Sequence, residues 1–152
     1  TLVQDLLDKI DIARRHFDAM TTGAIDDLTA IVHPAASNRE AVIEPPACRG
    51  TGPAAWAATS AWLHQMAPDV TWEVHEAVAH GDLIAVHCTM SGTQTGKHEY
   101  FDAAGNVVAV MPPTGRRFQV TQSHWLRIAD GKIIEHWANR DDLGMARQLG
   151  WL

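Results

Sequence analysis

The hydrophobic pattern of this chain changes its period near residue 70, and that change limits the folds open to it. Residues 2–20 repeat apolar side chains at helical spacing, on a single stripe. From Val70 to Val78, apolar side chains largely alternate with polar ones, as in a strand with one buried face. The chain therefore places its helices first and its strands second.

Turn and capping residues divide the two halves into elements. Gly23 is expected to end the first helix, and Pro34 follows a second, short helix. A short strand at Ala41–Glu44 and a third helix that stops at Pro68 complete this half. Long strands follow at 70–79, 83–96 and 117–130, with a hairpin arm at Lys97–Met111. A closing strand runs into a short C-terminal helix.

This order of elements predicts a single α+β domain spanning residues 1–152. N-terminal helices pack against a curved, mostly antiparallel sheet, which gives a cone-shaped α+β barrel with a short C-terminal helix. A cone of this kind leaves a mouth, and the concave face of the sheet lines the pocket behind it.

Charge and cysteine content bear on partners and location. The formal net charge is -6 without a run of Lys or Arg, so nucleic acid and anionic membranes are not expected as partners. No apolar run reaches the roughly 20 residues that a membrane-spanning helix needs. The two cysteines, Cys48 and Cys88, form no C-x-x-C pair and are interpreted as reduced thiols of a cytoplasmic protein.

Strand parity predicts which polar side chains enter the pocket. Gln122 and His124 share a face of the strand at 117–130, together with aliphatic residues. On the closing strand, Trp137, Asn139 and Asp141 share a face with Ile133 and Glu135. If both faces are concave, the polar members converge near the mouth. The alternative for Asp141 is that it caps the last helix.

A carboxylate beside an imidazole suits proton abstraction next to a carbonyl group. In this hypothesis Asp141 is the base, and His124 with Gln122 or Asn139 donates hydrogen bonds to the enolate oxygen. Trp137 shapes the pocket. No metal is expected, because the nine His include no H-x-x-x-H helix pair.

The segments "HGDLIAVHCTMSGTQTG" and "PPTGRRFQVTQSHWLRIADGKIIEHWANRDDLGMARQLG" resemble the SnoaL-like polyketide cyclases of the nuclear-transport-factor-two-like superfamily. The resemblance implies an enzyme that closes the last ring of an aromatic polyketide ester by intramolecular aldol condensation, without a cofactor. It implies Asp141 as the acid/base, with His124, Gln122, Asn38 and Phe17 around the substrate. Two departures stand out: Arg39 occupies a position where relatives often carry His, and the arm at Lys97–Met111 is longer than usual.

Other interpretations stay open on the sequence alone. They are an enzyme of a hydroxylation pathway, a hydrolase of the epoxide-hydrolase type, and a non-catalytic domain that binds small molecules. The expected partner is an aromatic, polyketide-like small molecule. A homodimer or homotetramer in the cytoplasm is predicted, because the convex side of such sheets is often paired.

Overall fold

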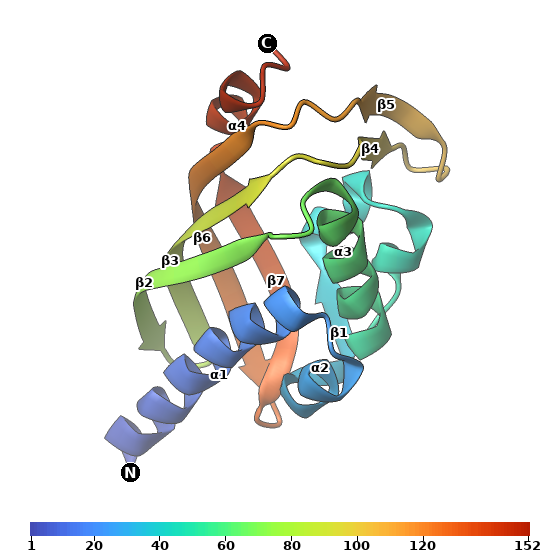
Figure 1. Cartoon of the computed structure of the whole chain (residues 1–152). Coiled ribbons are helices and arrows are strands. Elements are labelled where there is room, and N and C mark those ends of the chain that lie inside the picture. The colour runs from blue at the N-terminus through green and yellow to red at the C-terminus, as the bar shows by residue number, and fades with distance from the viewer.

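A curved sheet of five strands forms the frame of the computed structural model, which describes residues 1–152 (Figure 1). The strands are ordered β1-β7-β6-β3-β2, and all neighbours are antiparallel except β1 and β7. The predicted α+β class, with helices first and a mostly antiparallel sheet second, is confirmed. The elements are α1 (Leu2–Thr22), α2 (Ile25–Ile31), β1 (Val32–Asn38), α3 (Pro53–Met66), β2 (Thr71–His80), β3 (Leu83–Thr93), β4 (His98–Phe101), β5 (Val107–Met111), β6 (Arg117–Ala129), β7 (Lys132–Arg140) and α4 (Asp142–Gln148), with short 3₁₀ turns η1 (Arg39–Ile43) and η2 (Pro46–Arg49) before α3.

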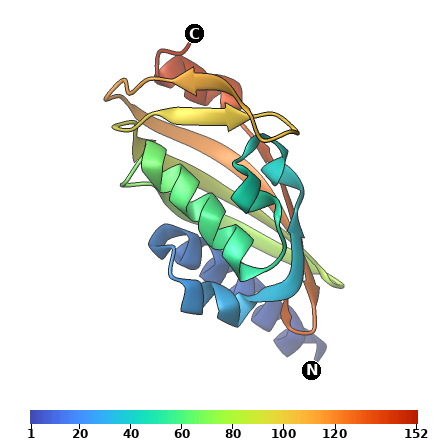
Figure 2. The same ribbon diagram turned by 90° about the vertical axis from the view of Figure 1, so that its right-hand side faces the viewer.

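The three N-terminal helices cover one side of the sheet, with α3 across its middle and α1 and α2 towards one end (Figure 2). Helix α1 begins where the Thr1 side chain accepts a hydrogen bond from the backbone N–H of Gln4, at 3.0 Å. It ends at Gly23, whose φ of 68° is the left-handed cap that the sequence predicted. Its apolar stripe places Phe17 in the core. None of the helices combines the length and the apolar character that crossing a membrane requires.

A single β-bulge between β6 and β7 decides which side chains face the helices. Along β6 the alternation holds throughout, so that Gln122 and His124 are buried on the concave face. Ile133 pairs with Ile128, whereas Glu135 pairs with Arg127, so Ile134 is an extra residue in β7. Beyond this bulge the parity of β7 is reversed.

The predicted hairpin arm is confirmed as a separate two-stranded sheet of β4 and β5. It crosses one end of the molecule beside α4 (Figure 2). The side-chain amide of Gln94 is buried where the arm joins the body of the protein. It donates hydrogen bonds to the backbone carbonyls of Met111 and Pro112, both at 3.1 Å. On the arm, His98 stacks on Trp62 of α3, with ring centroids 4.6 Å apart. The arm is therefore packed onto the body of the protein.

The region between α2 and α3 differs from the prediction. The strand expected at Ala41–Glu44 is wrong, because Arg39–Ile43 form a 3₁₀ helix. The strand in this region is β1, which the helix-ending Pro34 concealed. It pairs in parallel with β7, about a hundred residues away in sequence. Local pattern cannot reveal such a pairing, since a parallel partner lies beyond any sequence window.

Candidate active site

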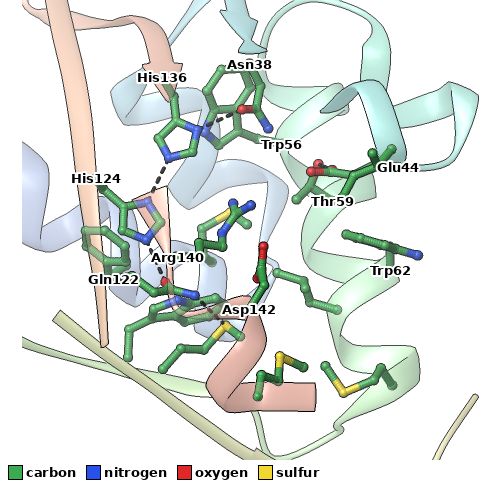
Figure 3. Close-up of a pocket in the computed structure, with 18 of the residues that line it drawn as sticks. Asn38, Glu44, Trp56, Thr59, Trp62, Gln122, His124, His136, Arg140 and Asp142 are labelled. Atoms are coloured by element: carbon green, nitrogen blue, oxygen red, sulfur yellow. Dashed lines mark hydrogen bonds between the residues drawn. The ribbon is translucent and has the colours of Figure 1, made fainter. Parts of the chain in front are cut away.

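One large pocket lies between the concave face of the sheet and helices α1 and α3 (Figure 3). Its volume of about 800 Å³ includes space open to solvent at the mouth. Aromatic side chains from α1, α3, β2 and β4 form much of its wall: Phe17, Trp56, Trp62, Trp72 and Tyr100. A concave site with an apolar wall and a few placed polar groups is typical of small-molecule binding.

A chain of four polar side chains runs along the sheet side of the pocket (Figure 3). The Nδ1 atom of His136 is 2.8 Å from Asn38 Oδ1, and its Nε2 atom is 2.8 Å from His124 Nδ1. His124 Nε2 is in turn 2.7 Å from Gln122 Oε1. All three residues from β6 and β7 are buried, at 3–5% exposure. The amide of Gln122 has one further contact, a weak hydrogen bond to the sulfur of Met90 at 3.5 Å.

Burial keeps this histidine pair neutral. Loss of hydration lowers the pKa of both His124 and His136 well below the usual value for histidine. The positive charge of Arg140, on the same concave face, lowers both pKa values further, as do neighbouring imidazoles including His16. The pair therefore offers neutral hydrogen-bonding groups to a ligand at neutral pH.

A second histidine site lies beside the first. The Nε1–H of Trp56 donates to His16 Nε2 at 3.1 Å, so the proton of the neutral imidazole is on Nδ1. That Nδ1 atom is buried without a hydrogen-bond partner. Burial lowers the pKa of His16 to about 4. Trp56 is thereby fixed as a wall of the pocket.

The opposite side of the pocket carries a buried carboxyl group (Figure 3). Glu44 is 1% exposed, and the hydroxyl of Thr59 donates to its Oε1 atom at 2.5 Å. Burial raises the pKa of Glu44, and the Thr59 hydrogen bond opposes that shift only in part. The protonated form of this carboxyl is favoured relative to an ordinary glutamic acid, which makes it a potential proton donor.

The mouth of the pocket has a separate carboxylate and a guanidinium group. Asp142, in the first turn of α4, is exposed to solvent, and its carboxylate points into the pocket below Arg140 (Figure 3). Arg140 also lies 3.7 Å from a carboxylate oxygen of Glu40. Burial raises the pKa of Tyr100 on the arm to about 12, and the charge of Asp142 contributes to that rise. Asp142 thus places a carboxyl group beside the pocket's polar residues.

The structure brings together four of the seven residues that the sequence singled out. Phe17, Asn38, Gln122 and His124 all line the pocket. The placement predicted for Trp137, Asn139 and Asp141 is wrong, and none of the three lines it. Trp137 and Asn139 lie beyond the bulge at Ile134, where the parity of β7 is reversed, and so face away from the helices.

Asp141 has the alternative role that the sequence left open. It is the N-cap of α4, and its Oδ1 atom accepts a hydrogen bond from the backbone N–H of Gly144 at 2.9 Å. A Cβ atom on Gly144 would lie 2.2 Å from Asp141 Oδ2, so a side chain at residue 144 would displace the capping carboxylate. The chain turns at Asp141, and this turn directs the next side chain, Asp142, inward.

Sequence reasoning missed His136, Arg140 and Asp142 near the end of the chain, and it also missed Glu44 and His16 on other walls of the pocket. Parity assigned His136 and Arg140 to the outer face. The adjacent pair Ile133-Ile134 was the available signal, because two successive apolar residues interrupt a strict alternation. No group of three or more His, Cys, Asp or Glu is arranged to hold a metal ion.

Comparison with known proteins agrees with this geometry. Residues 10–149 match the family of SnoaL-like polyketide cyclases. The chain belongs to the SnoaL-like polyketide cyclase family. The predicted family, its fold and an enzyme of the polyketide cyclase type are thereby confirmed.

Relatives of the chain match nearly its whole length. Aklanonic acid methyl ester cyclase DnrD of Streptomyces peucetius is 36% identical over 143 residues, which are 93% of this chain and 90% of the relative. Nogalonic acid methyl ester cyclase of Streptomyces nogalater is 32% identical over 135 residues, covering 87% and 90%. The solved structure of TsrD from Streptomyces laurentii superposes with a TM-score of 0.73 at 26% identity, over 96% of this chain and 97% of the other.

Proposed function

We propose that this protein closes a ring of an aromatic polyketide ester by intramolecular aldol condensation, without a cofactor. The observation that carries the proposal is one pocket that combines aromatic walls with the carboxyl group of Asp142, the guanidinium of Arg140 and the buried carboxyl of Glu44. The names of its relatives support the substrate class, since they act on the methyl esters of aklanonic and nogalonic acid.

The walls of the pocket suit flat, fused rings. Phe17 and Trp56 approach from two helices, and Trp62 stands in the α3 wall on the Glu44 side. Trp62 is held in place by an Nε1–H hydrogen bond to the backbone carbonyl of Glu99, at 2.9 Å, and by stacking on His98. Aromatic side chains contribute large apolar contact area at low conformational cost. The reacting groups of the substrate then lie among the polar residues.

Asp142 takes the base role that the sequence analysis gave to Asp141. Its carboxylate removes a proton from a carbon next to a carbonyl group, and Arg140 faces the negative charge that develops on the enolate oxygen. The enolate carbon bonds to a second carbonyl carbon of the same molecule. Glu44, whose pKa is raised by burial, donates a proton from its protonated form to the resulting alkoxide. Proton transfer from Asp142 back to Glu44 restores both groups. His124 and Gln122 contact substrate oxygens on the other side.

One observation also supports the alternative function, a hydrolase of the epoxide-hydrolase type. Arg140 and Asp142 both line the pocket, opposite the carboxyl of Glu44, and an Asp–Arg–Asp site of the epoxide-hydrolase type also combines two carboxyls with an arginine. Hydrolysis would add the mass of water to the product. The predictions of a homodimer or homotetramer and of a cytoplasmic location stand beside this function as further proposals.

The test is turnover of aklanonic acid methyl ester by the wild type, with product mass as the readout. Ring closure by aldol addition leaves the mass unchanged, whereas gain of one oxygen or of water indicates hydroxylation or hydrolysis. Asp142→Asn is expected to lower kcat by about 10²- to 10⁴-fold, which is the usual contribution of general base catalysis. The matched control, Asp141→Asn, keeps a good helix cap and normal turnover. Normal turnover in Asp142→Asn would overturn the base assignment.

A further inference from the structure

The hydrogen-bond chain on the sheet side of the pocket contains a mismatch between two acceptors. Asn38 Oδ1 accepts a hydrogen bond from the backbone N–H of Glu40 at 3.1 Å, which fixes that atom as the amide oxygen. The Nδ1 atom of His136, 2.8 Å from this oxygen, must therefore carry a proton. A neutral imidazole has one N–H group, so the Nε2 atom of His136 is a bare acceptor.

The proton positions on His124 follow by the same reasoning. His136 Nε2 is 2.8 Å from His124 Nδ1, so His124 Nδ1 carries the proton and donates. His124 Nε2 is then also a bare acceptor. It faces Gln122 Oε1, an amide oxygen, at 2.7 Å. Two lone pairs at this distance repel each other, and the contact is unfavourable unless a donor comes between them or the amide turns.

Gln122 is poorly held in the position that creates this mismatch. Its Nε2 atom has only the sulfur of Met90 as a partner, at 3.5 Å, and sulfur is a weak acceptor. A turned amide would present N–H to His124 and leave its oxygen beside the sulfur. By contrast, a hydroxyl group can donate to His124 Nε2 and accept from the Gln122 amide at the same time. Both residues line the pocket, so such a group can come from a ligand.

The mismatch would also be removed if the histidine pair took up one more proton. Burial opposes the positive charge that this proton would bring. The pair is at most 5% exposed, and the cation of Arg140 and the imidazole of His16 both face it. A positive charge here would lack hydration and a carboxylate partner. The neutral pair with a bare Nε2 on His124 is therefore the resting state.

We propose that His124 Nε2 and the Gln122 amide form a subsite for a hydroxyl group of the substrate, an enol or a phenol, and that Asn38 and His136 are positioning residues that fix His124 as its acceptor. This reverses the donor role that the sequence analysis gave to His124. The proposal rests on the proposed function only in taking this pocket as the substrate site, and it does not depend on aldol chemistry. It restricts the substrate to molecules with O–H, rather than C=O, at this wall.

The tautomer is measured directly by long-range ¹H–¹⁵N NMR of the histidine side chains at pH 7.5. We expect His124 and His136 each to show a protonated Nδ1 and an unprotonated Nε2. Asn38→Leu removes the acceptor for the Nδ1–H of His136 and should release the pattern. Protonated Nε2 on His124 of the wild type would overturn the proposal, and that result needs no variant to fold.

Binding of two matched probes tests the subsite without turnover. 2-Naphthol and 2-methoxynaphthalene share a ring system, and only the first can donate a hydrogen bond. We expect 2-naphthol to bind about tenfold more tightly, because the ether leaves buried His124 Nε2 unpaired. In His136→Phe, which keeps a ring of similar size, the preference should fall to about twofold or less, with the affinity for the ether unchanged.

The outcomes separate this proposal from the proposed function. Equal affinity of the two probes for the wild type would reject the hydroxyl subsite, even if the enzyme closes rings. A tenfold preference that is lost in His136→Phe supports the subsite even if aklanonic acid methyl ester is not turned over. A preference that persists in folded His136→Phe and Asn38→Leu would show that these two residues do not position His124.

Discussion

Two aromatic pairs join β6 to β7, one on each face of the sheet, and they differ in almost every physical respect. On the concave face, the rings of His124 and His136 lie 5.1 Å apart, joined by a 2.8 Å hydrogen bond. On the convex face, Trp125 and Trp137 are direct strand partners, with parallel rings 6.3 Å apart. The guanidinium of Arg39 covers Trp137 at 4.2 Å from the ring centre.

The difference shows how burial changes the role of neighbouring residues on the same strands. The histidine pair is desolvated, so its nitrogen atoms must be matched with specific partners, and each mismatch becomes a constraint on a ligand. The tryptophan pair is half-buried and contacts cations that keep their access to water. Such contacts contribute about 0.5–1 kcal/mol at exposed sites and impose no comparable constraint.

Adjacent substitutions on β6 should separate the two faces most sharply. His124→Phe removes a hydrogen-bonding group from the pocket and is expected to lower kcat/KM by about 10²-fold. Trp125→Phe, one residue along the strand and on the other face, should change kcat/KM by about twofold or less. Steady-state kinetics with aklanonic acid methyl ester measures both. Equal losses in the two variants would mean that the convex face takes part in catalysis.

The stability of the protein should fall in acid because its pocket-side histidines are buried. Burial lowers the pKa of His16 and His98 to about 4 from an ordinary value of 6.5, and the pKa values of His124 and His136 fall in the same direction. At pH values between the folded and the unfolded pKa, these histidines bind protons in the unfolded chain but not in the folded chain. The free energy of unfolding therefore decreases as the pH falls from 6.5 towards 4. Each of His16 and His98 contributes about 3 kcal/mol to this loss.

Urea unfolding at pH 7 and at pH 4.5 measures this decrease in the free energy of unfolding. His98→Phe should flatten the pH dependence, because it removes one titrating group while keeping an aromatic ring between Trp62 and Trp151. An unchanged urea midpoint between the two pH values would contradict the assignment of these histidines as buried and neutral.

The convex face should show its importance in assembly rather than in catalysis. If copies of the chain pair through this face, Trp137→Ala removes apolar area from the contact and should shift a dimer towards monomer. Interface tryptophans commonly contribute about 2 kcal/mol or more to association. Sedimentation velocity at micromolar concentration, with wild type and Trp125→Phe alongside, checks this. A wild type that sediments only as monomer would remove the prediction of an oligomer.

The sequence alone determined the fold class, the pairing of the hairpin arm and the placement of Gln122 and His124 in the pocket. These rest on local signals: the helical stripe that ends at Gly23, the alternation along β6, and turn residues between strands. Gln122 and His124 were placed on the correct face because β6 has no irregularity in its burial pattern between Phe118 and Ile128. Period-two patterning is reliable wherever a strand is regular.

Only the tertiary structure decided the rest of the site. An extra residue at Ile134 reverses parity, exchanging Trp137 for His136 and Asn139 for Arg140 in the pocket. The turn into α4 then assigns Asp141 to the helix cap and Asp142 to the pocket. Both outcomes depend on how distant strands and a helix pack together, and a one-residue shift moves every later side chain to the other face. Beyond the pair Ile133-Ile134, the residue types do not show which parity faces the pocket, because both parities of β7 present a plausible mixture of aromatic, polar and charged side chains.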